Sequence, residues 1–206
     1  MTQHDYETPA RREFQVLSRQ TCYEGFFRLE RLGLIHSLHG GGMSPVLSRE
    51  IVERGDVAAV LLYDPRLDCV VMIEQFRVGA MADSRGPWLL EIVAGLIEPG
   101  ETPEDVARRE AIEEAGCAIQ TLEPITRFYA TPAKSSEHSY LYCGLVDAAN
   151  AGGVHGLVHE GEDIRVVPLA ADDALALVDN GTINSAWPII ALQWLARHRE
   201  RLRSGA

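Results

Sequence analysis

Residues 95–117 read GLIEPGETPEDVARREAIEEAGC, and this stretch predicts a helix with defined ends. Thr102, followed three residues later by Asp105, is typical of a helix N-terminus, and Pro103 suits the first helical position. Gly116 suits the C-terminal cap. The preceding strand-like residues and the turn-forming EPGE then predict a strand, a turn and a helix in direct succession.

The expected helix carries a cluster of acids that its own geometry disfavours. Glu110, Glu113 and Glu114 fall within one arc of roughly 100°, in the last turns, where the helix dipole disfavours negative charge. Glu110 and Glu114 also form a like-charge pair one turn apart, and only Arg109 offsets the charge locally. A divalent cation held by clustered carboxylates would compensate, whereas the alternative is a solvated acidic face. The opposite face, with Ala107, Ala111 and Ala115, predicts close packing on a sheet.

Length and charge narrow the class of protein. The 206 residues, 46% hydrophobic and 24% charged, are typical of a globular protein with one ordinary domain and a smaller appendage. The net charge of −11 argues against binding nucleic acid polymers, and no apolar run reaches the length of a membrane span. The first 14 residues lack the apolar core of a signal peptide, so we expect a cytoplasmic protein. Four scattered cysteines indicate reduced thiols.

Patterning along the chain predicts two domains. Three expected strands (14–19, 26–36 and 45–52) form a small antiparallel sheet within residues 1–55, which is marginal alone and must dock on something. Residues 56–206 are expected to form an α+β catalytic domain, a mixed β-sheet sandwiched between helices. Its expected strands are 57–62, 69–73, 88–93, 125–130, 139–146 and 164–169; its further helices are 171–178 and 185–202; residues 150–163 are expected to be an exposed loop.

The spacing G-x5-E-x7-R-E-x2-E-E-x-G resembles the Nudix box, the signature of hydrolases that cleave nucleoside diphosphates linked to another moiety. Its fixed positions here are Gly95, Glu101, Arg109, Glu110, Glu113, Glu114 and Gly116. Ala111 and Cys117 depart from the pattern, because the family usually carries larger aliphatic residues there. Pro132, 16 residues after Gly116, resembles the mark of the bacterial ADP-ribose pyrophosphatases. Further similarity to that branch lies in REIVERG (49–55), IEQFR (73–77), WLLEIVAG (88–95), SSEHS (135–139), GLVHEGEDI (156–164) and IIALQWL (189–195).

The resemblance implies a metal-dependent reaction, the hydrolysis of ADP-ribose to AMP and ribose 5-phosphate. Two or more Mg²⁺ ions, for which Mn²⁺ can substitute, would be held by Glu110, Glu114 and the backbone carbonyl of Ala94, with Glu113 as a further ligand or water holder. Arg109 would orient these carboxylates. Glu160, in the mobile loop and in preference to Glu162, would be the general base.

The resemblance also implies substrate contacts. Arg77 would meet a phosphate, Glu137 would contact the ribose or diphosphate region, and Pro132 marks the same segment. Phe27 would stack on adenine, and the alternative is that it packs in the core, since one of Phe26 and Phe27 in a strand should face inward. Arg49, Glu50 and Arg54 would lie near the adenine, and the alternative is that they are ordinary charges on a strand face. In the family, the small sheet crosses to the second subunit of a homodimer.

Three functions therefore compete. The first is hydrolysis of ADP-ribose. The second keeps the chemistry but acts on another nucleoside diphosphate sugar such as GDP-mannose. The third is a non-catalytic ADP-ribose sensor, which the intact set of box glutamates disfavours.

Overall fold

The computed structural model of the chain describes residues 12–205 and divides into two compact units. The first contains residues 12–54 and 131–137, and the second contains residues 55–130 and 138–205. Residues 1–11, which include the start of the expected domain 1–55 and most of the segment compared with a signal peptide, lie outside the described part. No helix of residues 12–205 is long and apolar enough to cross a membrane.

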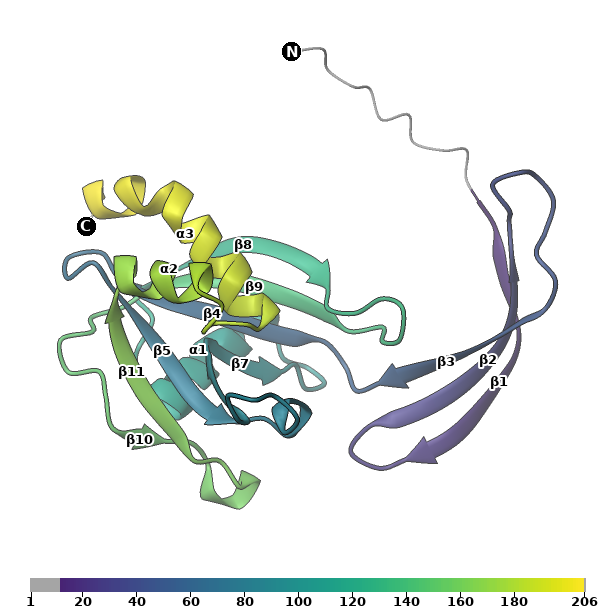
Figure 1. Cartoon of the computed structure of the whole chain (residues 1–206), viewed down its shortest axis with the longest axis horizontal. Helices are drawn as coiled ribbons and strands as arrows, with labels where there is room; N and C mark the ends of the chain where they lie inside the picture. Colours follow the sequence, from purple (N-terminus) through teal and green to yellow (C-terminus); the bar gives the residue numbers. More distant parts are fainter. Residues whose placement is uncertain (1–11, 206) are drawn as a thin grey trace, which may run out of the picture. The chain divides into compact units, whose positions relative to one another are not determined.

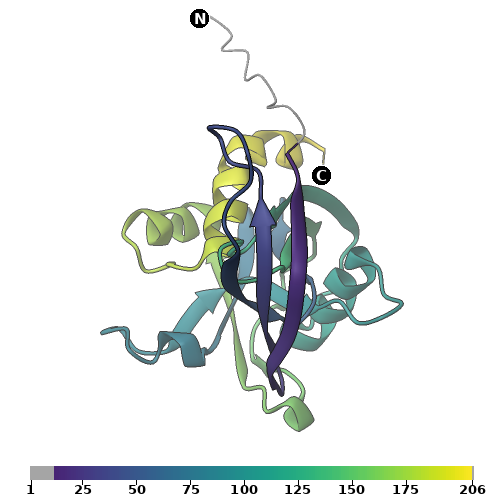
Figure 2. The same cartoon turned by 90° about the vertical axis from the view of Figure 1, so that its right-hand side faces the viewer.

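The first unit is a three-stranded antiparallel sheet in the order β1-β2-β3, with β1 at an edge (Figures 1 and 2). Its strands are β1 (Phe14–Glu24), β2 (Arg28–His36) and β3 (Leu47–Glu53). Residues 131–137 join the sheet at β3, because the Val52 N–H donates to the Lys134 carbonyl at 2.8 Å and Val52 bridges to Ser135. This unit therefore contains a segment from the middle of the chain that the sequence prediction assigned to the catalytic domain.

β1 is unusual because each of its eleven residues is exposed. Phe14, Leu17 and Tyr23 are 76%, 48% and 62% exposed. Single exposed apolar residues are common, but several on one strand leave apolar surface that a partner would cover. The first unit by itself thus supports the expectation that the small sheet docks on something.

The second unit is built on a mixed eight-stranded sheet (Figure 1). The strand order is β10-β11-β5-β4-β9-β8, with β6 paired to β5 and β7 paired to β4. β4 and β9 are parallel, and the other pairs are antiparallel, as the mixed-sheet prediction requires. The strands are β4 (Val57–Asp64), β5 (Cys69–Phe76), β6 (Trp88–Glu91), β7 (Val93–Leu96), β8 (Thr121–Tyr129), β9 (His138–Leu145), β10 (Val154–His155) and β11 (Ile164–Ala170).

Helices cover both faces of this sheet, which makes β4 buried at all eight positions. Leu61 and Tyr63 pack with α2 and α3, whereas Val60 and Leu62 pack with α1. Neighbouring residues of a strand point to opposite faces, so a continuous apolar run suits a strand between two helical layers. The helices are α1 (Pro103–Ala115), α2 (Ala171–Asp179) and α3 (Ala186–Ser204); the short 3-10 turns are η1 (Val78–Ala80) and η2 (Val158–Glu160).

The predicted single strand 88–93 is wrong, because the segment changes partners midway. β6 pairs with β5, and after Ile92 the chain continues as β7, which pairs with β4. β4 and β5 pair with each other only near their turn, at Leu62–Asp64 with Cys69–Val71. The segment fills the gap where the two strands separate, and β7 then runs directly beneath α1.

The prediction that residues 150–163 form a plain exposed loop is also wrong in part. The segment contains β10, which pairs with β11, and the turn η2. The Gly156 N–H donates to the Glu113 carbonyl at 3.1 Å, and the His155 ring bonds the Gly152 carbonyl at 3.0 Å. The start of the loop is therefore fastened to the end of α1, while η2 lies beyond this attachment.

Candidate metal and diphosphate site

Helix α1 begins and ends where the sequence predicts. The Thr102 side chain accepts a hydrogen bond from the Asp105 N–H at 3.2 Å, and the Asp105 carboxylate accepts one from the Thr102 N–H at 3.4 Å. Gly116 adopts the left-handed conformation at φ 64°, which favours glycine. One face of α1 is buried against the sheet through Ala107, Ala111 and Ala115. This packing fixes the rotation of the helix about its axis and therefore the direction in which the acidic face points.

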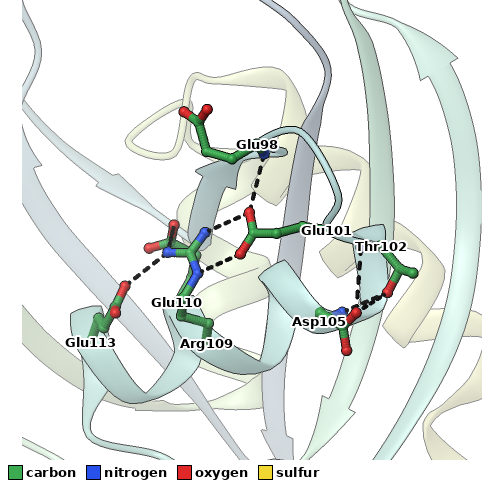
Figure 3. A network of polar contacts seen from close by, with 7 residues as sticks. All are labelled: Glu98, Glu101, Thr102, Asp105, Arg109, Glu110 and Glu113. Atoms are coloured by element: carbon green, nitrogen blue, oxygen red, sulfur yellow. Dashed lines mark hydrogen bonds and ion pairs between the residues drawn. The ribbon is translucent and has the colours of Figure 1, made fainter.

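Arg109 lies at the centre of the acidic face (Figure 3). Its Nη1 donates to Glu110 Oε1 at 2.8 Å and to Glu113 Oε2 at 2.9 Å, and its Nε donates to Glu101 Oε1 at 3.0 Å. The hydrogen bond from Arg109 lowers the pKa of Glu101. One guanidinium thus orients three box carboxylates, two from the helix and one from the turn before it.

Glu114 is the most deeply buried of the box acids, with 2% of its surface exposed. Its Oε2 accepts a hydrogen bond from the Ala94 N–H on β7 at 3.0 Å. Burial raises the pKa of Glu114 to about 8, with further contributions from the charges of Glu110 and Glu162. Burial also raises the pKa of Glu110. A cation bound between these two carboxylates would favour their charged forms and offset the effect of burial.

Position 95 requires glycine because α1 approaches β7 closely there. A Cβ at this position would overlap the Glu110 side chain. The first glycine of the box is therefore required for space and not for an unusual backbone angle. Glu110 therefore lies directly over the β7 backbone at Gly95.

The residues in this place suit a hard divalent cation. All available donors are oxygens, from Glu110, Glu113, Glu114 and the Ala94 carbonyl, which is the donor type that Mg²⁺ and Mn²⁺ prefer. In residues 12–205, no three acids, histidines or cysteines are arranged as a closed ligand set. Glu110 and Glu113 instead point to Arg109 (Figure 3), so binding a cation requires them to turn from the guanidinium.

Arg77 follows β5 and forms an ion pair with Glu91 on β6, with Nε 2.6 Å from Oε2. The Arg77 side chain is 38% exposed, whereas the Glu91 side chain is 6% exposed. Both line a surface pocket of about 690 Å³, with Leu89 and Trp187 among its other walls. Arg77 is therefore reachable from solvent, as a phosphate contact requires, but its charge is already paired.

The two acids of the loop lie differently from one another. The Glu160 side chain is 56% exposed and lies 3.6 Å from the His159 ring. Glu162 accepts a hydrogen bond from the Leu157 N–H at 2.8 Å, and its charge contributes to the raised pKa of Glu110 and Glu114. In this conformation Glu162 is the acid that faces the cluster, and Glu160 points into solvent.

The remaining candidates belong to the first unit. Phe27 lies in the turn between β1 and β2, is 49% exposed and packs edge-on against Phe26 at 4.8 Å. Phe26 is 65% exposed beneath the Arg54 guanidinium, so the expectation that one of the pair faces the core is wrong. A turn, unlike a strand, leaves both rings outside. Glu50 pairs with Arg31 at 3.0 Å, and Arg49 is exposed and bonds the Ser48 carbonyl.

Pro132 and Glu137 lie on the segment that joins β3. Pro132 is exposed, and Glu137 is partly buried, with its N–H bonded to the Ser135 hydroxyl at 3.2 Å. The structure thus brings Phe27, Arg49, Glu50, Arg54, Pro132 and Glu137 into one unit, and Arg77, Ala94, Arg109, Glu110, Glu113, Glu114 and Glu160 into the other.

The sequence analysis did not identify Glu91 and Gln75 as candidate site residues. Both are buried polar residues on strands that precede the box. The available signal was the occurrence of each inside an apolar strand, Glu91 in WLLEIVAG and Gln75 in VVMIEQF. Buried polar residues are usually paired or functional. Their partner, however, depends on strand register, which the sequence alone did not supply.

A fold with this sheet, this capped helix and these placed glutamates is that of a Nudix protein, and comparison with known sequences agrees. Residues 53–182 match the family model described as the NUDIX domain, so the chain belongs to the Nudix family. The resemblance drawn from the box is confirmed.

Particular relatives narrow the similarity. The ADP-ribose pyrophosphatase of Escherichia coli (strain K12) is 47% identical over 197 residues, covering 96% of this chain and 94% of the relative. A GDP-mannose pyrophosphatase of Cronobacter sakazakii is 36% identical over 148 residues, covering 71% and 76%. A crystal structure described as an ADP compounds hydrolase shares the fold, with a TM-score of 0.70 at 20% identity over 95% of this chain and all of that one.

Proposed function

We propose that this protein hydrolyses the pyrophosphate bond of ADP-ribose, giving AMP and ribose 5-phosphate, with a divalent cation. The observation that carries the proposal is the set of box carboxylates on α1, packed onto β7 and oriented by Arg109. The relative that is 47% identical over nearly the whole chain supports the choice of substrate.

The cation would be Mg²⁺, in two or more copies, with Mn²⁺ as a substitute. Glu110, Glu113, Glu114 and the Ala94 carbonyl would hold it. When bound, it would neutralise the diphosphate and activate water for attack. Glu114 would be a firmly fixed ligand, because it is buried and accepts a hydrogen bond from the Ala94 N–H. Arg109 would hold Glu110 and Glu113 in place until the cation binds.

Glu160 would accept the proton of the attacking water. A general base should have a free carboxylate, and Glu160 is exposed on a turn beyond the point where the loop is fastened to α1. The loop must move inward for this role, as active-site loops often do. Since Glu162 is engaged with the Leu157 N–H, it would hold the loop's shape.

Substrate contacts are proposed in each unit separately. Arg77 would contact a phosphate from its pocket, and Glu137 and Pro132 would contribute near the ribose and diphosphate. Phe27 is exposed, as an adenine-stacking residue must be, and Arg49, Glu50 and Arg54 would lie nearby. We also propose a homodimer, since β1 is exposed throughout. The net charge of −11 argues against binding nucleic acid, and we further propose that the protein is cytoplasmic and does not bind membranes.

GDP-mannose, or another nucleoside diphosphate sugar, is the second candidate substrate, favoured by the 36% identity to a GDP-mannose pyrophosphatase. A sensor without activity is the weaker alternative, because all the box glutamates are present.

A substrate panel tests the proposal. Pure protein with Mg²⁺ is incubated with ADP-ribose, GDP-mannose and other nucleoside diphosphate sugars, and the released phosphomonoester is measured after phosphatase treatment. We expect the highest kcat/KM for ADP-ribose. A higher value for GDP-mannose would select the second candidate, and no hydrolysis of any compound would support the sensor.

A further inference from the structure

Gln75 on β5 is a buried amide with an unused donor. The residue is 8% exposed, and its Nε2 is buried without a hydrogen-bond partner in the described part of the chain. Leaving a buried donor unpaired is unfavourable, so natural proteins keep few of them. Such a donor calls for a function that uses it in another state.

Strand register places Gln75 beside the Arg77–Glu91 ion pair. On β5 and β6, Ile73 lies opposite Glu91 and Gln75 lies opposite Leu89. Because alternate residues share a face, Gln75, Arg77 and Glu91 share the face of Ile73, which packs with α1. Glu91 is the diagonal cross-strand neighbour of Gln75, within the reach of long side chains.

The ion pair itself joins an accessible group to an inaccessible one. Arg77 and Glu91 line the same pocket of about 690 Å³, but only Arg77 has a substantially exposed side chain. A diphosphate entering the pocket would compete with Glu91 for the guanidinium. If Arg77 turned to it, Glu91 would remain as a buried anion without its partner, which is strongly unfavourable.

We propose that Gln75 is a positioning residue that donates its amide N–H to Glu91 when Arg77 turns to the diphosphate of the substrate. The donor left unpaired in the free protein is satisfied in the complex, and Arg77 is released for binding. Gln75 then acts through Arg77 and does not touch the substrate. This inference rests on the proposed function, since it requires a diphosphate as ligand.

Gln75→Met is the informative variant, because methionine has a similar length and shape but no donor. Since the lost N–H has no partner in the free protein, we expect Tm to stay equal or to rise. We expect KM for ADP-ribose to rise about tenfold, as for loss of a hydrogen bond to a charged group, with kcat within threefold. Gln193→Met, at an exposed position of α3, is the matched control and should leave KM unchanged.

A double variant separates this role from a general packing effect. Arg77→Ala should raise KM by itself, and adding Gln75→Met should then have no further effect, because no guanidinium needs release. The inference is overturned if Gln75→Met keeps the wild-type KM, lowers Tm, or raises KM equally with and without Arg77. A wild-type protein that leaves ADP-ribose intact would refute the proposed function and this inference together, whereas hydrolysis with an unchanged KM in Gln75→Met would refute the inference alone.

Discussion

At the scale of single residues, burial disfavours the charged form of two of the box carboxylates. Glu114 is buried with a pKa of about 8, and burial also raises the pKa of Glu110. Arg109 is shared among Glu101, Glu110 and Glu113 and reaches no oxygen of Glu114 in the bonds described. The charge on Glu114 is therefore the one that a cation would stabilise most.

Glu114→Gln should change how stability depends on pH in metal-free protein. The folded-state pKa of Glu114 is raised from its ordinary value of 4.5 to about 8. The contribution of protonated Glu114 to the free energy of unfolding is thus fully present below about pH 4.5, and it is lost as the pH rises through about 8. In EDTA, the wild type should lose up to a few kcal/mol relative to Glu114→Gln between these values.

Thermal melts of the wild type and of Glu114→Gln at pH 5 and pH 8 measure the difference in stability between them. All other titrating groups are present in both proteins, so their effects cancel in the comparison. Adding Mg²⁺ should remove most of the wild-type loss at pH 8. Parallel pH curves for the two proteins would show that Glu114 ionises normally and does not need a cation.

Gly95→Ala should weaken the metal site without unfolding the protein. The new methyl overlaps the Oε1, Cδ and Cγ atoms of Glu110, so we expect this side chain to turn away while the backbone stays in place. We expect a loss of about 10- to 100-fold in Mg²⁺ affinity or activity, the usual effect of disturbing the surroundings of a ligand. Gly40→Ala, where no atom lies within 4 Å of the new Cβ, serves as the control. Unchanged Mg²⁺ dependence in Gly95→Ala would contradict the placement of Glu110.

At the scale of elements, helix α1 could be predicted from sequence and its surroundings could not. The caps at Thr102, Asp105 and Gly116 are local chemistry, so sequence identifies them directly. The change of partner at Ile92 depends on where β4 and β5 separate, which is a tertiary feature. For the same reason the Arg77–Glu91 pair was missed, because it joins residues from two strands whose register is unknown beforehand.

The loop between β9 and β11 carries a prediction about catalysis. Glu160→Gln should lower kcat by roughly 10²- to 10⁴-fold, the usual contribution of a positioned base, and leave KM within a few-fold. Glu162→Gln should do much less, since its role is to accept the Leu157 N–H. Steady-state kinetics of the two variants decide the matter. The opposite ranking would assign the base to Glu162, which faces the cluster in this conformation.

At the scale of the whole molecule, the first unit is the part that leaves the most strand surface uncovered. A sheet of three strands is marginal alone, and β1 leaves all eleven of its residues exposed. The three strands could be predicted from the sequence, and that the sheet docks on a partner stays a prediction. The pairing of residues 131–137 with β3 could not be foreseen, since it joins distant parts of the chain.

We predict a two-fold dimer in which the small sheet contacts the catalytic domain of the second subunit. Light scattering after size exclusion should report about twice the 22.7 kDa of one chain. Leu17→Glu, on exposed β1, should weaken the dimer by placing a charge in the contact. A fully active 22.7 kDa monomer would contradict the prediction.

The central claim is that the glutamates of α1 hold the cation on which hydrolysis of ADP-ribose depends. The most direct measurement is the rate of AMP formation from ADP-ribose by wild type and Glu114→Gln, first in EDTA and then with excess Mg²⁺. We predict no turnover in EDTA, full recovery of the wild type with Mg²⁺, and recovery of only a small fraction by Glu114→Gln. Turnover that survives chelation, or a Glu114→Gln variant as active as the wild type, would contradict the claim.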